Sequence, residues 1–304
     1  MRGFITRNPV LTFVGLTWLL QWGLIALVMV ITPAGSTVIE DGTAHSVFRL
    51  RLLGPLLVCL AVTYYLEGSK GVGKLFAAYS RWKVPAQWYL LAFSWKFINA
   101  YLALGFVFLI YGTFPGLYVD RFWEGWAVNL PAIIYIALME ETAWMKFGVT
   151  RLQMRYNALT SALLIGFCWG MWYLPMLIIN EGVPPGYPVP VFMGCMLGLG
   201  IMLTWAYNMT RSGLVLLIMQ IISNTAFFVT PVLFAVTNDE HYIVAYSWVF
   251  MGFCALLPVL FGARDLSRKP RARWDTDTEF RVKEQGVEEE APATVFATKE
   301  RVGV

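Results

Sequence analysis

Apolar residues are grouped along the chain into eight long stretches that hold few charges, and shorter polar or charged segments separate them. An α-helix of about 20 apolar residues crosses a hydrocarbon core of roughly 30 Å, and most of the stretches come close to that length. They cover residues 11–31, 52–66, 88–111, 127–152, 158–179, 191–209, 214–236 and 242–261. The pattern therefore predicts an all-α polytopic membrane protein with about eight transmembrane helices.

The pattern changes after Gly262, where charged residues become frequent and apolar periodicity ends. A segment of this kind buries too little apolar surface to offset the entropy that ordering costs. We therefore predict a transmembrane helical domain over residues 1–262 and a cytoplasmic, disordered tail over residues 263–304.

Composition supports the same class of protein. Hydrophobic residues make up 58% of the 304 residues and charged residues only 14%, which excludes an ordinary soluble domain. The net charge of +4 is spread over several loops, so membrane lipids are expected partners and nucleic acid is not. The four cysteines lie in apolar stretches without CxxC spacing, which predicts neither a disulfide framework nor a thiolate metal site.

The basic residues predict how the chain is oriented, because cytoplasmic loops of membrane proteins are enriched in Lys and Arg. If the N-terminus is cytoplasmic, only Arg49, Arg51 and Arg121 fall in outer loops, and the other basic residues near span ends fall inside. We therefore predict that both termini are cytoplasmic. The expected location is the inner membrane of a bacterial cell.

Two adjacent acids, Glu140 and Glu141, lie inside the fourth apolar stretch, and Lys96 with Asn99 interrupts the third. A charged side chain in the middle of a transmembrane helix costs roughly 2.5–3.5 kcal/mol on insertion scales, so it usually faces a bundle interior and marks a functional site. We therefore predict that the acids lie in a polar cavity formed with other helices.

Other polar and aromatic residues repeat at helical spacing in the later stretches. Trp169 and Tyr173 are four residues apart, and so are Gln220 and Asn224, so each pair lies on one face of its helix. Lys146 follows the acids within the same stretch, and Lys96 with Asn99 lies in the third stretch. A polar group deep in a membrane prefers another polar group to lipid, so we expect these residues to surround the acids.

In order and spacing, these residues resemble the CAAX prenyl protease and bacteriocin-processing family of intramembrane proteases, also called the CPBP or Abi family. That family has three motifs on successive helices: E-E-x-x-x-R, then F-x-x-x-H often followed by Leu-Pro, then H-x-x-x-N. Here the segments read EETAWM from Glu140, WGMWYLP from Trp169 and QIISN from Gln220. The resemblance covers Glu140 to Asn224 and implies a CPBP-like bundle with catalytic residues at Glu140, Glu141 and Asn224.

The departures from the family pattern bear on the chemistry. Met145 stands at the arginine position, and Tyr173 and Gln220 stand where the family has histidines thought to bind a metal or activate water. Neither tyrosine nor glutamine is a good base or a usual zinc ligand. The two histidines of the chain, His45 and His241, fall in predicted outer loops. We therefore predict no metal and no other cofactor.

Three functions fit this pattern, and the first is a repurposed intramembrane enzyme. A carboxylic acid in a low-dielectric pocket can stay protonated at neutral pH and act as a general acid, as Glu140 would here. Aromatic ring faces stabilise cations by roughly 0.5–2 kcal/mol each. This combination suits protonation of an apolar isoprenoid, prenyl or lipid-like substrate, followed by terpene cyclase- or isomerase-type chemistry. The predicted substrate-binding residues are Trp144, Lys146, Trp169, Trp172, Tyr173 and Gln220.

Two alternatives remain open. In one, the chain is a non-catalytic pseudoprotease, a scaffold that binds a protein partner and keeps Glu140 for packing. In the other, it is a metal-free CAAX-type peptidase, in which Glu140 activates water and Asn224 donates a hydrogen bond to the oxyanion.

Overall fold

The computed structural model describes residues 2–112, 122–183, 186–225 and 240–277, and every regular element in these ranges is a helix. The elements are α1 (Arg2–Arg7), α2 (Pro9–Ile31), α3 (Gly42–Leu50), η1 (Arg51–Leu53), α4 (Gly54–Ala77), η2 (Ala78–Ser80), α5 (Ala86–Tyr111), α6 (Phe122–Glu140), η3 (Glu141–Val149), α7 (Thr150–Leu152), α8 (Ala158–Ile179), α9 (Val189–Thr210), α10 (Gly213–Thr225) and α11 (Glu240–Phe261).

Within these ranges, six helices are long and apolar enough to cross a membrane, which confirms the predicted all-α integral membrane fold. They are Pro9–Ile31, Gly42–Ser80, Ala86–Tyr111, Ala158–Ile179, Val189–Thr210 and His241–Phe261. The other two predicted spans are helical as well: residues 127–152 fall on α6, η3 and α7, and α10 covers the start of residues 214–236. The rest of that last span lies outside the described residues. The orientation and the choice of membrane stay predictions.

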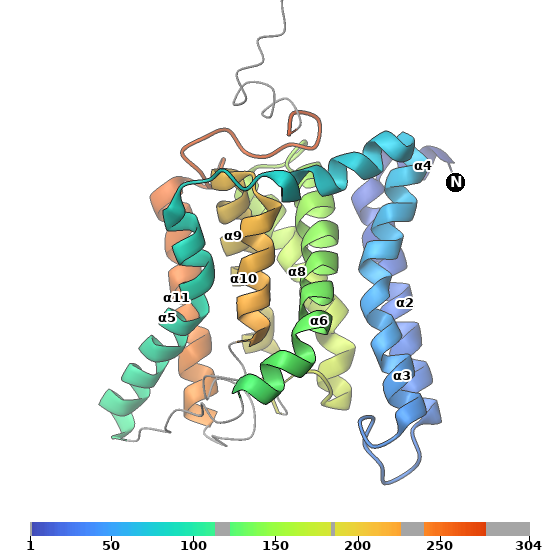
Figure 1. The fold of residues 1–304 in the computed structure, drawn as a ribbon, viewed down its shortest axis with the longest axis vertical. Helices are drawn as coiled ribbons and strands as arrows, with labels where there is room; N and C mark the ends of the chain where they lie inside the picture. The colour runs from blue at the N-terminus through green and yellow to red at the C-terminus, as the bar shows by residue number, and fades with distance from the viewer. Residues whose placement is uncertain (1, 113–121, 184–185, 226–239, 278–304) are drawn as a thin grey trace, which may run out of the picture.

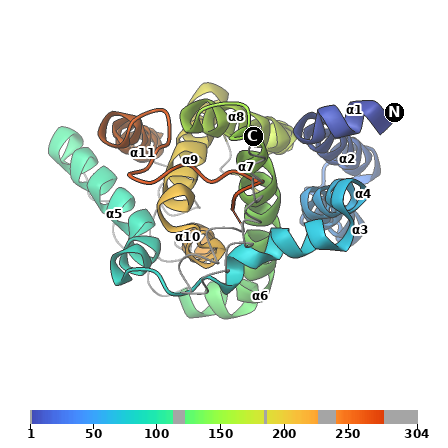
Figure 2. The ribbon, with the colours of Figure 1, turned by 90° about the horizontal axis from the view of Figure 1, so that it is seen from above.

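The long helices run roughly side by side (Figure 1). Seen from above, α5 and α11 lie at one side, α2, α3 and α4 lie at the other, and α6, α8, α9 and α10 lie between them (Figure 2). Helices α8 and α9 pack backbone to backbone, because a Cβ added to Gly200 would lie 2.5 Å from the Ala162 carbonyl oxygen and 3.1 Å from the Gly166 Cα. Small residues of this kind let membrane helices approach closely.

Helix α4 turns sharply at Gly68, where φ is 63° and ψ is −155°. Only glycine adopts this conformation without strain, so the residue fixes where the membrane-crossing part of the helix ends. The second part of α4, which carries Lys70 and Lys74, lies across the end of the bundle (Figure 1).

The acid pair lies where an α-helix gives way to a π-helix. Helix α6 ends at Glu140, and η3 continues from Glu141 as a π-helix of nine residues, each of them buried. Helix η3 packs against α4, α6, α8 and α10. The π-helix is rare and occurs most often at functional sites.

The sequence predicts disorder from residue 263, but residues 263–277 pack across the same end of the bundle as the second part of α4 (Figure 1). The carbonyls of Ala263 and Arg264 accept hydrogen bonds from the first two N–H groups of α8, at 3.0 and 2.9 Å. Trp274 and Asp277 are buried. The prediction of disorder therefore does not hold for this segment. Buried polar contacts order it, although it has no apolar periodicity. Residues 278–304 lie outside the described residues.

Candidate functional site

Three helices converge on Glu140, whose side chain is almost fully buried. Tyr173 on α8 donates a hydrogen bond from its hydroxyl to Oε1 of Glu140 at 2.6 Å. Gln220 on α10 donates from Nε2 to Oε2 at 2.7 Å. The structure therefore brings together one residue from each of the three segments that the sequence singled out.

A cavity of about 180 Å³ lies beside this cluster, between α5, α8, α9, α10 and α11. Tyr173 and Gln220 line it, whereas Glu140 is not among the lining residues and lies behind them. The wall is mostly apolar and aromatic; its other aromatic residues are Trp95, Trp169, Tyr187, Phe192, Tyr246 and Phe250. Contact between Glu140 and a molecule in the cavity therefore runs through the Tyr173 hydroxyl or the Gln220 amide.

The hydrogen bonds of Glu140 can be satisfied in two protonation states. A carboxylate accepts from both Tyr173 and Gln220. A neutral acid still accepts from Gln220 at Oε2 and donates from Oε1 to the Tyr173 oxygen, which frees the tyrosine hydroxyl proton for the cavity. The pair of Glu140 and Tyr173 can therefore move a proton into the cavity without moving any heavy atom far.

The remaining two predicted catalytic residues are placed differently. Asn224 lines the cavity, but its Nδ2 donates to the main-chain carbonyl of Gln220 at 3.0 Å, one turn earlier in α10. Glu141 is buried on η3, and neither of its carboxyl oxygens has a hydrogen-bond partner in the described part of the chain. It shares no hydrogen bond with the partners of Glu140.

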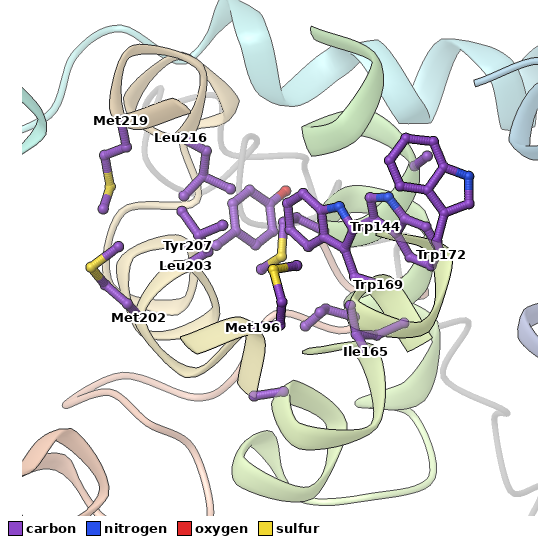
Figure 3. Close-up of a cluster of buried hydrophobic side chains, with 14 of the residues drawn as sticks. Trp144, Ile165, Trp169, Trp172, Met196, Met202, Leu203, Tyr207, Leu216 and Met219 are labelled. Atoms are coloured by element: carbon purple, nitrogen blue, oxygen red, sulfur yellow. The ribbon is translucent and has the colours of Figure 1, made fainter. Parts of the chain in front are cut away.

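The three predicted substrate-binding tryptophans form one cluster (Figure 3). Trp144 stacks on Trp169 with ring centroids 5.8 Å apart, and it meets Trp172 edge-on at 6.4 Å. Of the three, only Trp169 lines the cavity. Trp144 packs on the ring of Trp169 and Trp172 packs against Trp144, so the structure gives both a packing position and not a place in the wall.

Lys146 does not join the acid pair. Its ammonium bonds to the carboxylate of Asp277, which also accepts hydrogen bonds from Tyr207 at 2.7 Å and from Arg211 at 3.3 Å. All four side chains are buried. Burial alone would raise the pKa of Asp277, but the charges of Lys146 and Arg211 hold that pKa below its usual value. Lys146 therefore fastens η3 to the segment 263–277.

Sequence reasoning expected Lys96 to pair with the acids. Lys96 instead lines the cavity from α5, with its ammonium 5.3 Å from the Trp95 ring centroid and 5.0 Å from that of Tyr246. Sequence reasoning missed Asp277 altogether, because it lies in a charged segment without any pattern. No signal in the sequence points to its buried position.

The donor groups around Glu140 do not fit a catalytic zinc ion, which usually takes three protein ligands from His, Cys and carboxylate side chains. In the residues that the structure describes, no three such side chains gather in one place. Tyr173 and Gln220 are not usual zinc ligands.

The middle part of the chain is similar to a known protein family. Residues 121–226 match the model of a family described as type II CAAX prenyl endopeptidase Rce1-like. The match covers less than half of the chain, but it contains Glu140, Tyr173 and Gln220, which meet in the structure. No curated protein matches the chain.

Proposed function

We propose that the chain is an integral membrane enzyme that protonates an isoprenoid, prenyl or other lipid-like chain in the cavity. Glu140 is the proton donor, and the Tyr173 hydroxyl passes the proton on. One observation carries the proposal: Tyr173 lines an apolar, aromatic cavity while its hydroxyl lies 2.6 Å from the buried carboxyl group of Glu140. A proton relay at this position suits an alkene acceptor, because most of the cavity surface is apolar.

The step balances without any co-reactant. An alkene carbon uses its π electron pair to take the hydroxyl proton of Tyr173, and Glu140 returns a proton to the tyrosine oxygen. The substrate then holds a carbocation and Glu140 holds a negative charge. The faces of Trp169 and Phe250 can stabilise the cation. Loss of a proton from a neighbouring carbon to the same pair restores the enzyme and leaves an isomerised or cyclised product.

The family match supports the membrane setting and a prenyl-type ligand, whereas the residues at the site support a different reaction from peptide hydrolysis. In the motif resemblance, Tyr173 and Gln220 stand where histidines activate water. Here both groups bond to the carboxyl group of Glu140. Peptide hydrolysis also needs an oxyanion donor, and one of the two N–H donors of the Asn224 amide is already bonded to its own helix.

The proposal predicts the products of the reaction. Membranes that contain the protein, supplied with linear prenyl alcohols and with a prenylated peptide, should give isomers of unchanged mass and leave the peptide uncut. Trp169→Ala should change the ratio of products as well as the rate, because the Trp169 ring faces the reacting chain. Mass spectrometry coupled to chromatography measures both. The matched control is Trp82→Ala, since Trp82 is an exposed tryptophan outside the cavity and its loss should leave the product ratio unchanged. Cleavage of the peptide that depends on Glu140 would contradict the proposal.

One observation favours a second candidate, the non-catalytic scaffold. Both carboxyl oxygens of Glu140 are hydrogen-bonded within the protein, as expected for a residue that holds α6, α8 and α10 together. In that case no substrate is turned over, and the loss of the Glu140 carboxyl group affects helix packing alone.

A further inference from the structure

Arg51 is a buried cation with unsatisfied donors. The sequence places it in an outer loop, but α3, η1 and α4 follow one another without a gap, and Arg51 lies within this helical run. It is 7% exposed, and its Nε and Nη1 have no hydrogen-bond partner in the described part of the chain. Its guanidinium carbon lies 4.3 Å from the ring centroid of Phe48 and 5.5 Å from that of Trp172.

A guanidinium keeps its charge in proteins and carries five N–H donors in a planar fork. The rings of Phe48 and Trp172 stabilise the charge, but they do not replace the oxygen acceptors that the fork needs. A buried charge without a hydrogen-bonded counter-charge is strongly unfavourable. An anion from outside the chain would therefore supply the acceptors that Arg51 lacks.

Neither of the two carboxyl groups near Arg51, those of Glu140 and Glu181, is bonded to it. Glu140 and Glu181 lie near enough to interact electrostatically with Arg51, but Arg51 forms no ion pair with a described residue. The oxygens of Glu140 accept from Tyr173 and Gln220. Arg51 thus lies near the relay of Glu140 and Tyr173 without a hydrogen bond to either residue.

Gly182 connects Arg51 to the cavity. Gly182 lines the cavity, and a Cβ added there would lie 3.4 Å from Nη2 of Arg51. The same point lies 2.5 Å from Met176 Cε and 3.3 Å from Phe48 Cζ, so the edge of the guanidinium is adjacent to a cavity-lining residue but is not itself part of the wall. A second cation, Lys96, is part of the cavity wall, and the lining residues that the structure describes include no carboxylate. The described residues that line the cavity thus include a basic side chain and no acidic one.

We propose that the ligand of this cavity is an amphiphile with an anionic end group, a carboxylate or a phosphate, and that Arg51 binds this group. This inference rests on the proposed function, in which the cavity holds the apolar chain. The fork of Arg51 suits either anion, since both accept two parallel N–H···O bonds. Binding of the end group at Arg51 would place the adjoining part of the chain next to Tyr173.

Binding of three farnesyl probes tests the inference. The detergent-purified full chain is titrated with farnesol, farnesoic acid and farnesyl phosphate, and tryptophan fluorescence reports binding. At least one anionic probe should bind about 10- to 100-fold more tightly than farnesol, as expected for hydrogen bonds to a charged group. Arg51→Gln should remove this preference and leave farnesol binding unchanged. Arg51→Lys should keep part of the preference, because it retains the charge but not the fork. The acid or the phosphate, whichever binds more tightly to the wild type, identifies the end group.

Arg49→Gln is the matched control, since Arg49 is exposed, lies two positions away and carries the same charge. It should leave the preference for anionic probes intact. Retained farnesol binding in Arg51→Gln shows that the cavity is still folded. Equal affinities of the wild type for all three probes, or equal behaviour of Arg49→Gln and Arg51→Gln, would overturn the anion inference alone. If no farnesyl probe binds the wild type, the proposed cavity function fails together with it.

Discussion

Glu140→Gln is expected to lower the rate of product formation by about 10²- to 10⁴-fold, the usual effect of losing a general acid. Glutamine keeps the volume of the side chain and can still bond to Tyr173 and Gln220, so the three helices should stay in place. What it lacks is a proton that it can transfer. The measurement is the initial rate of isomer formation from a linear prenyl substrate in membranes with equal amounts of each protein.

Tyr173→Phe should cause a loss of similar size, because it removes the hydroxyl of the relay and keeps the ring. Tyr135→Phe removes a hydroxyl from a partly exposed tyrosine on α6 and should leave the rate unchanged. If Glu140→Gln and Tyr173→Phe both keep the wild-type rate, the relay is not catalytic. If no variant, the wild type included, turns over a prenyl chain or a peptide, the scaffold alternative stands.

Asp277→Ala is expected to reduce the free energy of unfolding by about 3–5 kcal/mol, the usual cost of breaking a buried ion pair from one side. The carboxylate of Asp277 accepts from Lys146, Arg211 and Tyr207, and its removal leaves two cations buried together without their shared counter-charge. Since Lys146 lies on η3, the change should also loosen the segment that begins at Glu141. Thermal unfolding in detergent, followed by circular dichroism, measures the effect.

Asp275→Ala is the control for this prediction. Asp275 belongs to the same segment and pairs with Arg273, but both side chains are about 40% exposed, so the loss should be at most about 1 kcal/mol. The stabilisation by Asp277 depends on pH with a definite sign. Because its pKa lies below the usual value, the contribution is present above about pH 4 and is lost as the pH falls through the lower folded value. Equal stabilities of the two variants at neutral pH would refute the role of Asp277.

Some features of the site could be predicted from the sequence because membrane-buried polar groups are strongly constrained. Glu140 is costly inside an apolar helix, so it requires polar partners from other helices. The i, i+4 spacing of the later segments limits which residues can supply them. Tyr173 and Gln220 were among the few candidates, and both bond to Glu140 in the structure.

Other features depend on contacts that no local pattern encodes. Lys146 follows Glu140 by between one and two helical turns, which directs it to another side of the helix, and its partner Asp277 comes from a segment far along the chain. Residues 263–277 are ordered by a few buried groups, among them Trp274 and Asp277. The average composition of the segment therefore does not predict that it is ordered. The π-helix of η3 contains no proline, and its geometry depends on packing against the neighbouring helices.

The transfer of solvent isotopes into product tests the central claim most directly. The wild type is incubated in D₂O enriched in ¹⁸O, with a linear prenyl substrate and a prenylated peptide present together, and all products are analysed by mass spectrometry. Proton delivery from Glu140 through Tyr173 predicts one deuterium on carbon in the isomerised or cyclised prenyl product, no ¹⁸O in it, and loss of this label in Glu140→Gln. Prenyl products without deuterium, or ¹⁸O in a new peptide carboxylate, would contradict the account.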